Sequence, residues 1–316
     1  MRLAIFGATS QIAKDLVLHF AAQSNHELVL YGRRPEAIVQ WLSYVGLAGR
    51  FEVVNFNDFN THEHFDGILN FVGVGDPAKA ALMGAHIFDV TLQYDDLALN
   101  YVRNHPECRY IFLSSGAAYG ANFFTSVDEK SLSYVAINKL KSQDWYGVAK
   151  LHAECRHRAL GSLPIVDVRV FSYFSHTQDM NARFLMTDIV RAVRDNTILK
   201  TSDDYIVRDF INPLDFFKLI SVLLLAPAEN VVVDTYSLKV IDKPDLLAAM
   251  KEKFGLHYEI SQSSVSVNAT GDKSHYYSRN TRAADFGYQP TLTSLEGIVK
   301  EMQMILQGTA RGTDRA

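Results

Sequence analysis

Cysteine, long apolar runs and charge of one sign are all scarce in this chain. Only two of its 316 residues are cysteine, Cys108 and Cys155, which excludes a disulfide scaffold, and no Cys/His cluster has the spacing of a metal site. No apolar run approaches the ~20 residues that span a bilayer. The net charge of −4 gives no reason to expect a nucleic-acid surface. We therefore predict a cytoplasmic protein without a metal, a membrane segment or a nucleic-acid partner.

The first predicted strand, residues 3–6, runs into a loop of small residues that opens a helix. A glycine at position 7 allows a tight turn, and small side chains at positions 10 and 13 let a pyrophosphate approach backbone N–H groups at the positive end of the helix. An ordinary strand-to-helix turn is the alternative. We assign cofactor binding in this loop to Gly7, Thr9, Ser10, Gln11 and Ile12.

Short apolar segments then alternate with helical ones. We expect further strands at 27–31, 51–56, 68–74, 110–114 and 164–170, and helices at 11–23 and 89–104. Buried strands separated by helices favour a parallel sheet covered on both faces. The prediction is an α/β fold, a doubly wound Rossmann-type parallel sheet with a smaller C-terminal substrate-binding region.

The second half of the chain is less regular. It predicts helices at 181–194, 216–225 and 242–254, a strand at 231–236 and a loop at 261–278 that folds over a ligand. We expect a cofactor domain at 1–170 with returning segments near 205–240, and a substrate-binding region at 171–204 and 241–306. The composition of 307–316 predicts a disordered tail.

The end of the second predicted strand lacks the acidic residue that usually takes the ribose 2′-hydroxyl of NAD. Arg33 and Arg34 stand there instead, and a guanidinium suits a phosphate by its charge and its paired donors. We predict that NADP(H) is preferred, with the 2′-phosphate on these arginines, while NAD(H) stays possible. Two solvated arginines in a surface loop are the alternative. Asp58, after the third strand, is assigned to the adenine amine by its position.

A hydroxyl, a phenol and an amine occur at a spacing that suits carbonyl/alcohol redox chemistry. Tyr146 and Lys150 are four residues apart and therefore share one face of a helix, and Ser115 ends an earlier strand. A free phenol titrates near ~10, and a nearby ammonium lowers that pKa towards the range of a general acid/base. Alone, such a pair would more often decorate a helix surface. The strand-borne serine and the N-terminal loop favour a catalytic site.

Taken together, these segments resemble the extended short-chain dehydrogenase/reductase family, the group of nucleotide-sugar epimerases, dehydratases and reductases. The resemblance includes the N-terminal loop and residues 114–120, 146–150, 168–171, 208–211 and 286–290. It implies a catalytic triad of Ser115, Tyr146 and Lys150, with Lys150 also binding the nicotinamide ribose. It further implies a nucleotide-diphosphate sugar as substrate and a homodimer.

The resemblance also implies where the substrate binds. Arg208 corresponds to the family arginine that grips the diphosphate, although an ion pair with Asp209 is the alternative. Tyr119 corresponds to a residue beside the nicotinamide and the sugar, or else packs in the core. Ser172 and His176 lie where the family places substrate contacts, and a solvated or structural histidine is the more common outcome for a loop.

Two small residues argue against one of the family's reactions, dehydration. The resembling 4,6-dehydratases carry two carboxyl groups after the triad hydroxyl, but Gly116 and Ala117 stand here and cannot transfer a proton. The main prediction is NADPH-dependent reduction of a 4-keto sugar, because of Arg33 and Arg34. The alternatives are an NAD-dependent nucleotide-sugar 4-epimerase and a non-catalytic NADP-binding regulator.

Overall fold

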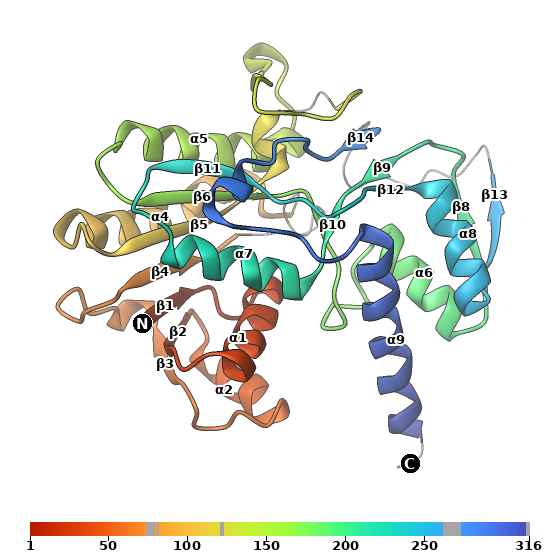
Figure 1. The fold of residues 1–316 in the computed structure, drawn as a ribbon, viewed down its shortest axis with the longest axis horizontal. Helices are drawn as coiled ribbons and strands as arrows, with labels where there is room; N and C mark the ends of the chain where they lie inside the picture. Colours follow the sequence, from red (N-terminus) through yellow and green to blue (C-terminus); the bar gives the residue numbers. More distant parts are fainter. Residues whose placement is uncertain (74–79, 81, 121–122, 262–272, 314–316) are drawn as a thin grey trace.

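A parallel sheet forms the larger part of the molecule (Figure 1). The computed structural model describes residues 1–73, 80, 82–120, 123–261 and 273–313. Seven strands pair in the order β11-β6-β5-β4-β1-β2-β3, all parallel. They are β1 (Arg2–Phe6), β2 (Glu27–Gly32), β3 (Glu52–Asn55), β4 (Gly67–Asn70), β5 (Arg109–Ser115), β6 (Ile165–Val170) and β11 (Val231–Asp234).

The strand order reverses at β1. The chain runs outwards through β2 and β3 and then crosses to β4 on the other side of β1. Such a reversal opens a crevice at the carboxyl ends of the strands, where open α/β sheets bind ligands. The prediction of a doubly wound α/β fold is confirmed.

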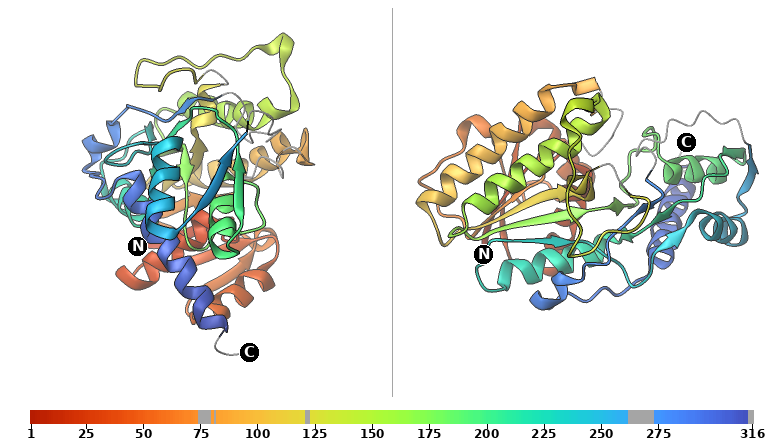
Figure 2. Two further views of the ribbon diagram at one scale, coloured as in Figure 1. Left: turned by 90° about the vertical axis from the view of Figure 1, so that its right-hand side faces the viewer. Right: turned by 90° about the horizontal axis from the view of Figure 1, so that it is seen from above.

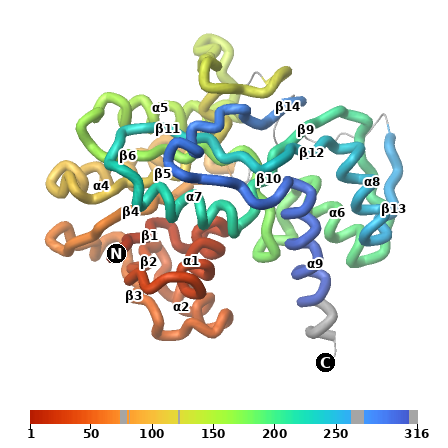
Figure 3. Tube along the Cα trace, viewed as in Figure 1, coloured from red at the N-terminus to blue at the C-terminus, as the bar shows by residue number. Residues whose placement is uncertain are grey.

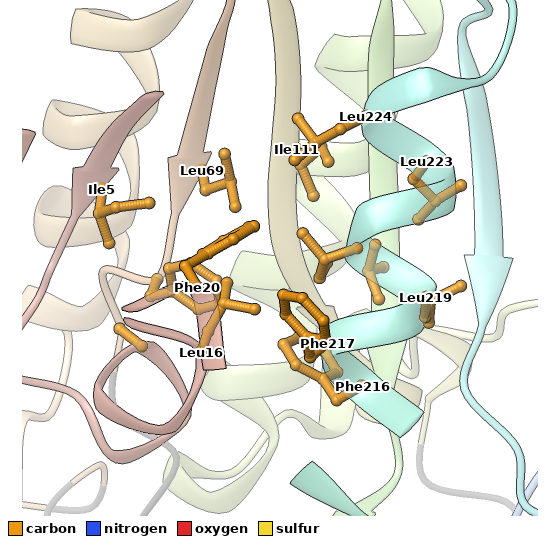
Figure 4. Packing of buried hydrophobic residues seen from close by; sticks show 14 of the residues in the cluster. Ile5, Leu16, Phe20, Leu69, Ile111, Phe216, Phe217, Leu219, Leu223 and Leu224 are labelled. Carbon is orange, nitrogen blue, oxygen red and sulfur yellow. The ribbon is translucent and has the colours of Figure 1, made fainter. Parts of the chain in front are cut away.

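Alternate side chains of each strand reach opposite faces of the sheet, and helices bury both. Leu3 and Ile5 pack with α1, α2 and α7, whereas Ala4 and Phe6 pack with α4 and α5. Figure 2 shows helices on both sides of the sheet. Figure 4 shows the first face, where Phe20 of α1 lies against Phe217 of α7 at a ring distance of 5.3 Å. The helices are α1 (Gln11–Gln23), α2 (Pro35–Tyr44), α4 (His86–Asn104), α5 (Trp145–Ala159) and α7 (Pro213–Leu225).

A smaller lobe with its own apolar cluster lies beside the sheet (Figure 3). Its elements are α6 (Leu185–Arg194), β8 (Ile198–Thr201), α8 (Lys243–Phe254), β13 (His257–Ile260) and α9 (Ser294–Thr313). Short strand pairs join it to the sheet: β7 (Ser172–Tyr173) with β10 (Phe210–Ile211), and β9 (Val207–Arg208) with β12 (Ile241–Asp242) and β14 (His275–Tyr276). Single helical turns complete the chain: η1 (Phe56–Asp58), η2 (Gly116–Tyr119), η3 (Ile137–Lys139), η4 (Ser142–Asp144) and η5 (Arg282–Phe286).

Several element boundaries differ from the sequence expectation. Helix α6 begins at Leu185 rather than at 181, because the Asp179 carboxylate accepts from the backbone N–H of Asn181 and holds a turn. Helix α7 begins earlier than 216, at Pro213, because the Asn212 side chain caps it. Strand β4 already ends at Asn70.

The predicted tail and loop are only partly covered by the described residues. Helix α9 extends to Thr313 and 314–316 lie outside the described residues, so the disordered tail expected at 307–316 stays a prediction. The expected loop at 261–278 contains β14, while 262–272 are outside the described part. Within the part of the chain that is described, no helix combines the length and apolar character needed to cross a membrane.

The contact between α1 and α7 can be tested by truncating Phe20, which is 1% exposed. We expect Phe20→Ala to lower the free energy of unfolding by about 3–5 kcal/mol, because it removes a buried ring and leaves a cavity. Tyr44→Ala is the control, since Tyr44 is 89% exposed at the end of α2 and its loss should change stability by less than ~0.5 kcal/mol. Denaturant unfolding measures both; equal losses would contradict the packing described here.

Candidate active site

The loop between β1 and α1 is built for close backbone approach. Gly7 has φ +76°, and a Cβ there would lie 2.9 Å from the backbone nitrogen of Val72, so only glycine fits. The hydroxyl of Ser10 accepts from the backbone N–H of Ala13 at 3.3 Å and caps α1. Because the loop lies at the strand-order reversal and opens a helix N-terminus, these residues fit a dinucleotide pyrophosphate.

The other residues predicted in this loop have different surroundings. Thr9 is exposed, and Ile12 packs against the core of the first sheet face. The Gln11 amide donates to the Ser175 hydroxyl at 2.8 Å. The Gln11 side chain therefore joins the loop to the segment that follows β7. The backbone N–H of Gln11 is then the group that could face a phosphate.

Arg33, Arg34 and Asp58 lie together at the edge formed by β2 and β3. These strands are in parallel register, with Gly32 opposite Asn55, so the residues after them come to the same end of the sheet. The Asn55 amide donates to the Arg33 carbonyl at 3.3 Å and fixes this turn. All three predicted side chains are exposed, so both guanidiniums are accessible to a phosphate at this edge.

Ser115, Tyr146 and Lys150 are brought together by a close contact between α5 and η2. Ser115 ends β5 directly before η2, and Tyr146 and Lys150 lie one turn apart on α5. A Cβ on Gly147 would lie 2.6 Å from the Ala117 carbonyl oxygen, so the glycine lets the helix approach. The contact brings Tyr146 close enough to Ser115 for the serine to lower the pKa of the phenol.

Burial sets the charge of these groups. Lys150 is 4% exposed, and desolvation lowers the pKa of its ammonium to about 8 against the opposing carboxylates of Asp95, Glu154 and Asp167. Its Nζ donates to the Leu113 carbonyl at 2.7 Å. Burial raises the pKa of Tyr146, and the hydrogen bond with Ser115 opposes that shift. Tyr146 is thus a protonated phenol at neutral pH, beside a lysine that is mostly a cation.

A second phenol reaches Ser115 from the C-terminal part of the chain. The Tyr276 hydroxyl on β14 lies 3.1 Å from Ser115 Oγ. Two cations lie over the Tyr276 ring, Lys273 Nζ at 4.8 Å and the Arg208 guanidinium carbon at 5.8 Å from its centre. Burial lowers the pKa of Arg208 to about 10 and that of Lys273 to about 8. Two like charges beside one ring favour a bound anion, whereas the contact of Arg208 with a diphosphate stays a prediction.

Sequence reasoning missed Tyr276 and Lys273. The signal that existed was the polar segment 261–278, which was expected to fold over a ligand but in which no residue was singled out. Their position depends on the pairing of β14 with β9, where Tyr276 lies opposite Arg208. That pairing joins residues far apart in the chain.

Tyr119 serves the core. Its hydroxyl donates to Asp234 at 2.8 Å, and the Arg169 guanidinium lies 4.2 Å from its ring centre. These contacts match the core alternative that was left open for Tyr119.

Ser172 and His176 also have surroundings of their own. Ser172 is half-buried in β7 opposite Phe210. The His176 ring contacts Glu301 on α9 at 2.7 Å, and this hydrogen bond raises the pKa of His176. The described contacts of His176 thus lead towards α9 rather than towards Ser115 or Tyr146.

The close contact at Gly147 generates a test. Gly147→Ala places a Cβ against the Ala117 carbonyl, so we expect a lower melting temperature and weaker NADH binding, even though alanine favours a helix by ~1 kcal/mol. Gly161→Ala is the control, because its nearest contact would be the Arg158 carbonyl oxygen at 3.9 Å. Calorimetry and NADH titration measure both variants. A Gly147→Ala protein as stable as the control would show that the contact is not tight.

Comparison with known proteins finds a family model that matches most of the sequence. The family model described as NAD dependent epimerase/dehydratase family matches residues 3–238. No curated protein sequence gives a significant match.

Solved structures extend the likeness over nearly the whole chain. A UDP-glucuronic acid 4-epimerase from Bacillus cereus in complex with NAD is 17% identical, with a TM-score of 0.75 over 97% of this chain and 99% of that one. A UDP-glucose 4-epimerase from Thermotoga maritima with UDP-glucose is 15% identical, with a TM-score of 0.77 over 98% and 100%.

A third similar structure is that of a dehydratase. The dTDP-glucose 4,6-dehydratase from Bacillus anthracis in complex with NAD is 14% identical, with a TM-score of 0.73 over 98% and 97%. At these identities the likeness establishes the fold. The match to the family model covers most of the chain, and the protein therefore belongs to the NAD dependent epimerase/dehydratase family.

Proposed function

We propose that this protein is a nicotinamide-dependent oxidoreductase that acts on a nucleotide-linked sugar. The observation that carries the proposal is the close contact of α5 with η2, which brings Tyr146 and Lys150, one turn apart on α5, to Ser115 at the end of β5. The cationic pair Arg208 and Lys273 beside Ser115 suits the diphosphate of such a substrate.

The residues have distinct chemical tasks in this proposal. Tyr146 gives a proton to, or takes it from, the reacting sugar oxygen, and Ser115 donates a hydrogen bond to the same oxygen as negative charge develops. Lys150 binds the nicotinamide ribose and favours the phenolate of Tyr146. The nicotinamide, when bound, supplies or accepts the hydride. Gly7, Ser10 and the first turn of α1 would hold its pyrophosphate.

Epimerisation at C4 with bound NAD is the reaction that we favour. Two of the structurally similar proteins are 4-epimerases described with NAD or with UDP-glucose. Dehydration is disfavoured by geometry as well as by residue type, because a Cβ on Gly116 would lie 2.5 Å from the Phe171 ring. The position after Ser115 therefore has no room for a carboxylate.

Reduction of a 4-keto sugar by NADPH is the second candidate. It rests on Arg33 and Arg34, whose exposed guanidiniums share the edge of the sheet where a 2′-phosphate would lie. The alternative of a non-catalytic NADP-binding regulator is disfavoured because Ser115, Tyr146 and Lys150 are all present and lie where α5 packs on η2. The homodimer and the cytoplasmic location stay predictions.

The catalytic assignment is tested by Tyr146→Phe. Loss of the phenol should lower turnover of UDP-glucose, UDP-glucuronic acid or a 4-keto nucleotide sugar by ~10²–10⁴-fold, because proton transfer at the sugar oxygen is lost. NADH binding should stay nearly unchanged. Tyr134→Phe is the control, since Tyr134 is 74% exposed. An active Tyr146→Phe enzyme would overturn the assignment.

The cofactor assignment is tested by Arg33→Ala. If Arg33 binds the 2′-phosphate, the variant should weaken NADPH by tenfold or more (~1.4 kcal/mol) while NADH changes little. Arg103→Ala, at an exposed arginine on α4, is the control. Fluorescence titration with both cofactors gives the result. Equal losses for NADPH and NADH would favour NAD and hence the 4-epimerase.

A further inference from the structure

A continuous chain of buried hydrogen bonds starts at the end of β4. The Val72 backbone N–H donates to Asn70 Oδ1 at 2.9 Å, and Asn70 Nδ2 donates to the Tyr110 hydroxyl at 2.9 Å. Tyr110 in turn donates to Asp95 Oδ1 on α4 at 2.9 Å. Asn70 Nδ2 can only donate, so the Tyr110 hydroxyl accepts from it and gives its own proton to Asp95.

His157 carries the chain from α4 into α5. Its Nε2 lies 2.8 Å from Asp95 Oδ1 and its Nδ1 lies 2.6 Å from Asp167 Oδ1, with the ring fully buried. Ionised carboxylates only accept, so both ring nitrogens carry protons and His157 is an imidazolium. Burial works against this charge, but the two carboxylates outweigh it and raise the pKa of His157 to about 9.

Two arginines on α5 bind the remaining oxygens of the two carboxylates. Arg156 binds the second oxygen of Asp95 at 2.7 Å, and Arg158 binds that of Asp167 at 2.7 Å. The cluster is therefore satisfied by directed partners on both carboxylates. A fully satisfied buried network of this kind is rigid, and removing one member leaves its neighbours unpaired.

This chain of hydrogen bonds begins beside Gly7 and ends near Lys150, two residues assigned above to cofactor binding. Val72 is the residue against which Gly7 is packed, and a Cβ on the next residue, Gly73, would lie 3.3 Å from Lys150 Nζ. At the other end, the His157 ring contacts Phe112 at 5.2 Å, and Lys150 Nζ lies 4.4 Å from the centre of that same Phe112 ring.

We propose that Asn70, Tyr110, Asp95 and His157 form a positioning network of the cofactor site, which holds the end of β4 and helix α5 at a fixed spacing around Lys150. This proposal concerns cofactor binding alone and does not depend on the sugar proposed above. Its effect is to keep the turn that packs on Gly7 in register with the helix that carries Lys150.

The decisive comparison is between two buried tyrosines. Tyr110→Phe breaks the network without changing any charge. Tyr101→Phe is its match, because the Tyr101 hydroxyl also makes two hydrogen bonds, accepting from Phe65 N and donating to Glu63 O at 2.8 Å each, and its ring is fully buried too. Both variants should lose similar stability. Only Tyr110→Phe should weaken NADH and NADPH binding, by roughly tenfold, as for other groups that orient a ligand-binding residue.

A second pair of variants covers the case in which Tyr110→Phe does not fold. Asp95→Asn cuts the network at α4. Asp96→Asn removes the neighbouring carboxylate, which also pairs with Arg156 but is not part of the hydrogen-bond network. Asp95→Asn should weaken NADH binding and Asp96→Asn should not. Melting temperatures are measured on the same samples, so that affinity is compared at matched stability.

The outcomes are distinct. Equal affinities in Tyr110→Phe and Tyr101→Phe, or in Asp95→Asn and Asp96→Asn, would overturn the proposal and leave a merely structural network. A wild-type protein that binds neither NADH nor NADPH would also overturn it. Failure to turn over any nucleotide sugar would instead refute the proposed function and leave this inference intact, because cofactor titration needs no sugar.

Discussion

The arrangement of the active site depends on one close approach, that of helix α5 to the backbone of η2. The helix can come this near only because Gly147 has no side chain facing the Ala117 carbonyl. Tyr146 and Lys150 flank this point on the helix, so a small outward shift would move both away from Ser115 together. Catalytic hydroxyl groups need sub-ångström placement, which makes a backbone contact a better determinant than any flexible side-chain pair.

Buried charge then holds the surrounding strands in place. Glu154, one turn beyond Lys150, binds Arg169 of β6 with contacts of 3.0 and 3.1 Å to Nε, and also binds Ser114, the residue before Ser115. Arg169 continues over the ring of Tyr119, whose hydroxyl binds Asp234 of β11. Three strands and α5 are thereby linked beneath the site. Removing one member of this network would leave a buried charge unpaired, which is costly.

The sequence alone predicts those features of the fold and the candidate site that depend on residues close together in the chain. The loop at Gly7, the strand-borne Ser115 and the helical spacing of Tyr146 and Lys150 are local patterns, and the sheet follows from alternating segments. The sequence was insufficient where partners are distant. Nothing near His176 predicts that Glu301 of α9 will bind it, and nothing near position 276 predicts pairing of that strand with β9.

The contact between Ser115 and Tyr276 has a consequence for affinity. A ligand oxygen that reaches Ser115 exchanges one hydroxyl partner for another, so the number of hydrogen bonds on the serine barely changes and the net gain at that point is small. Binding strength must then come from the charge next to this point, since Arg208 and Lys273 both lie over the Tyr276 ring. A ligand that reaches Ser115 is thus held mainly by its negative charge, while the exchange of hydroxyl partners contributes little.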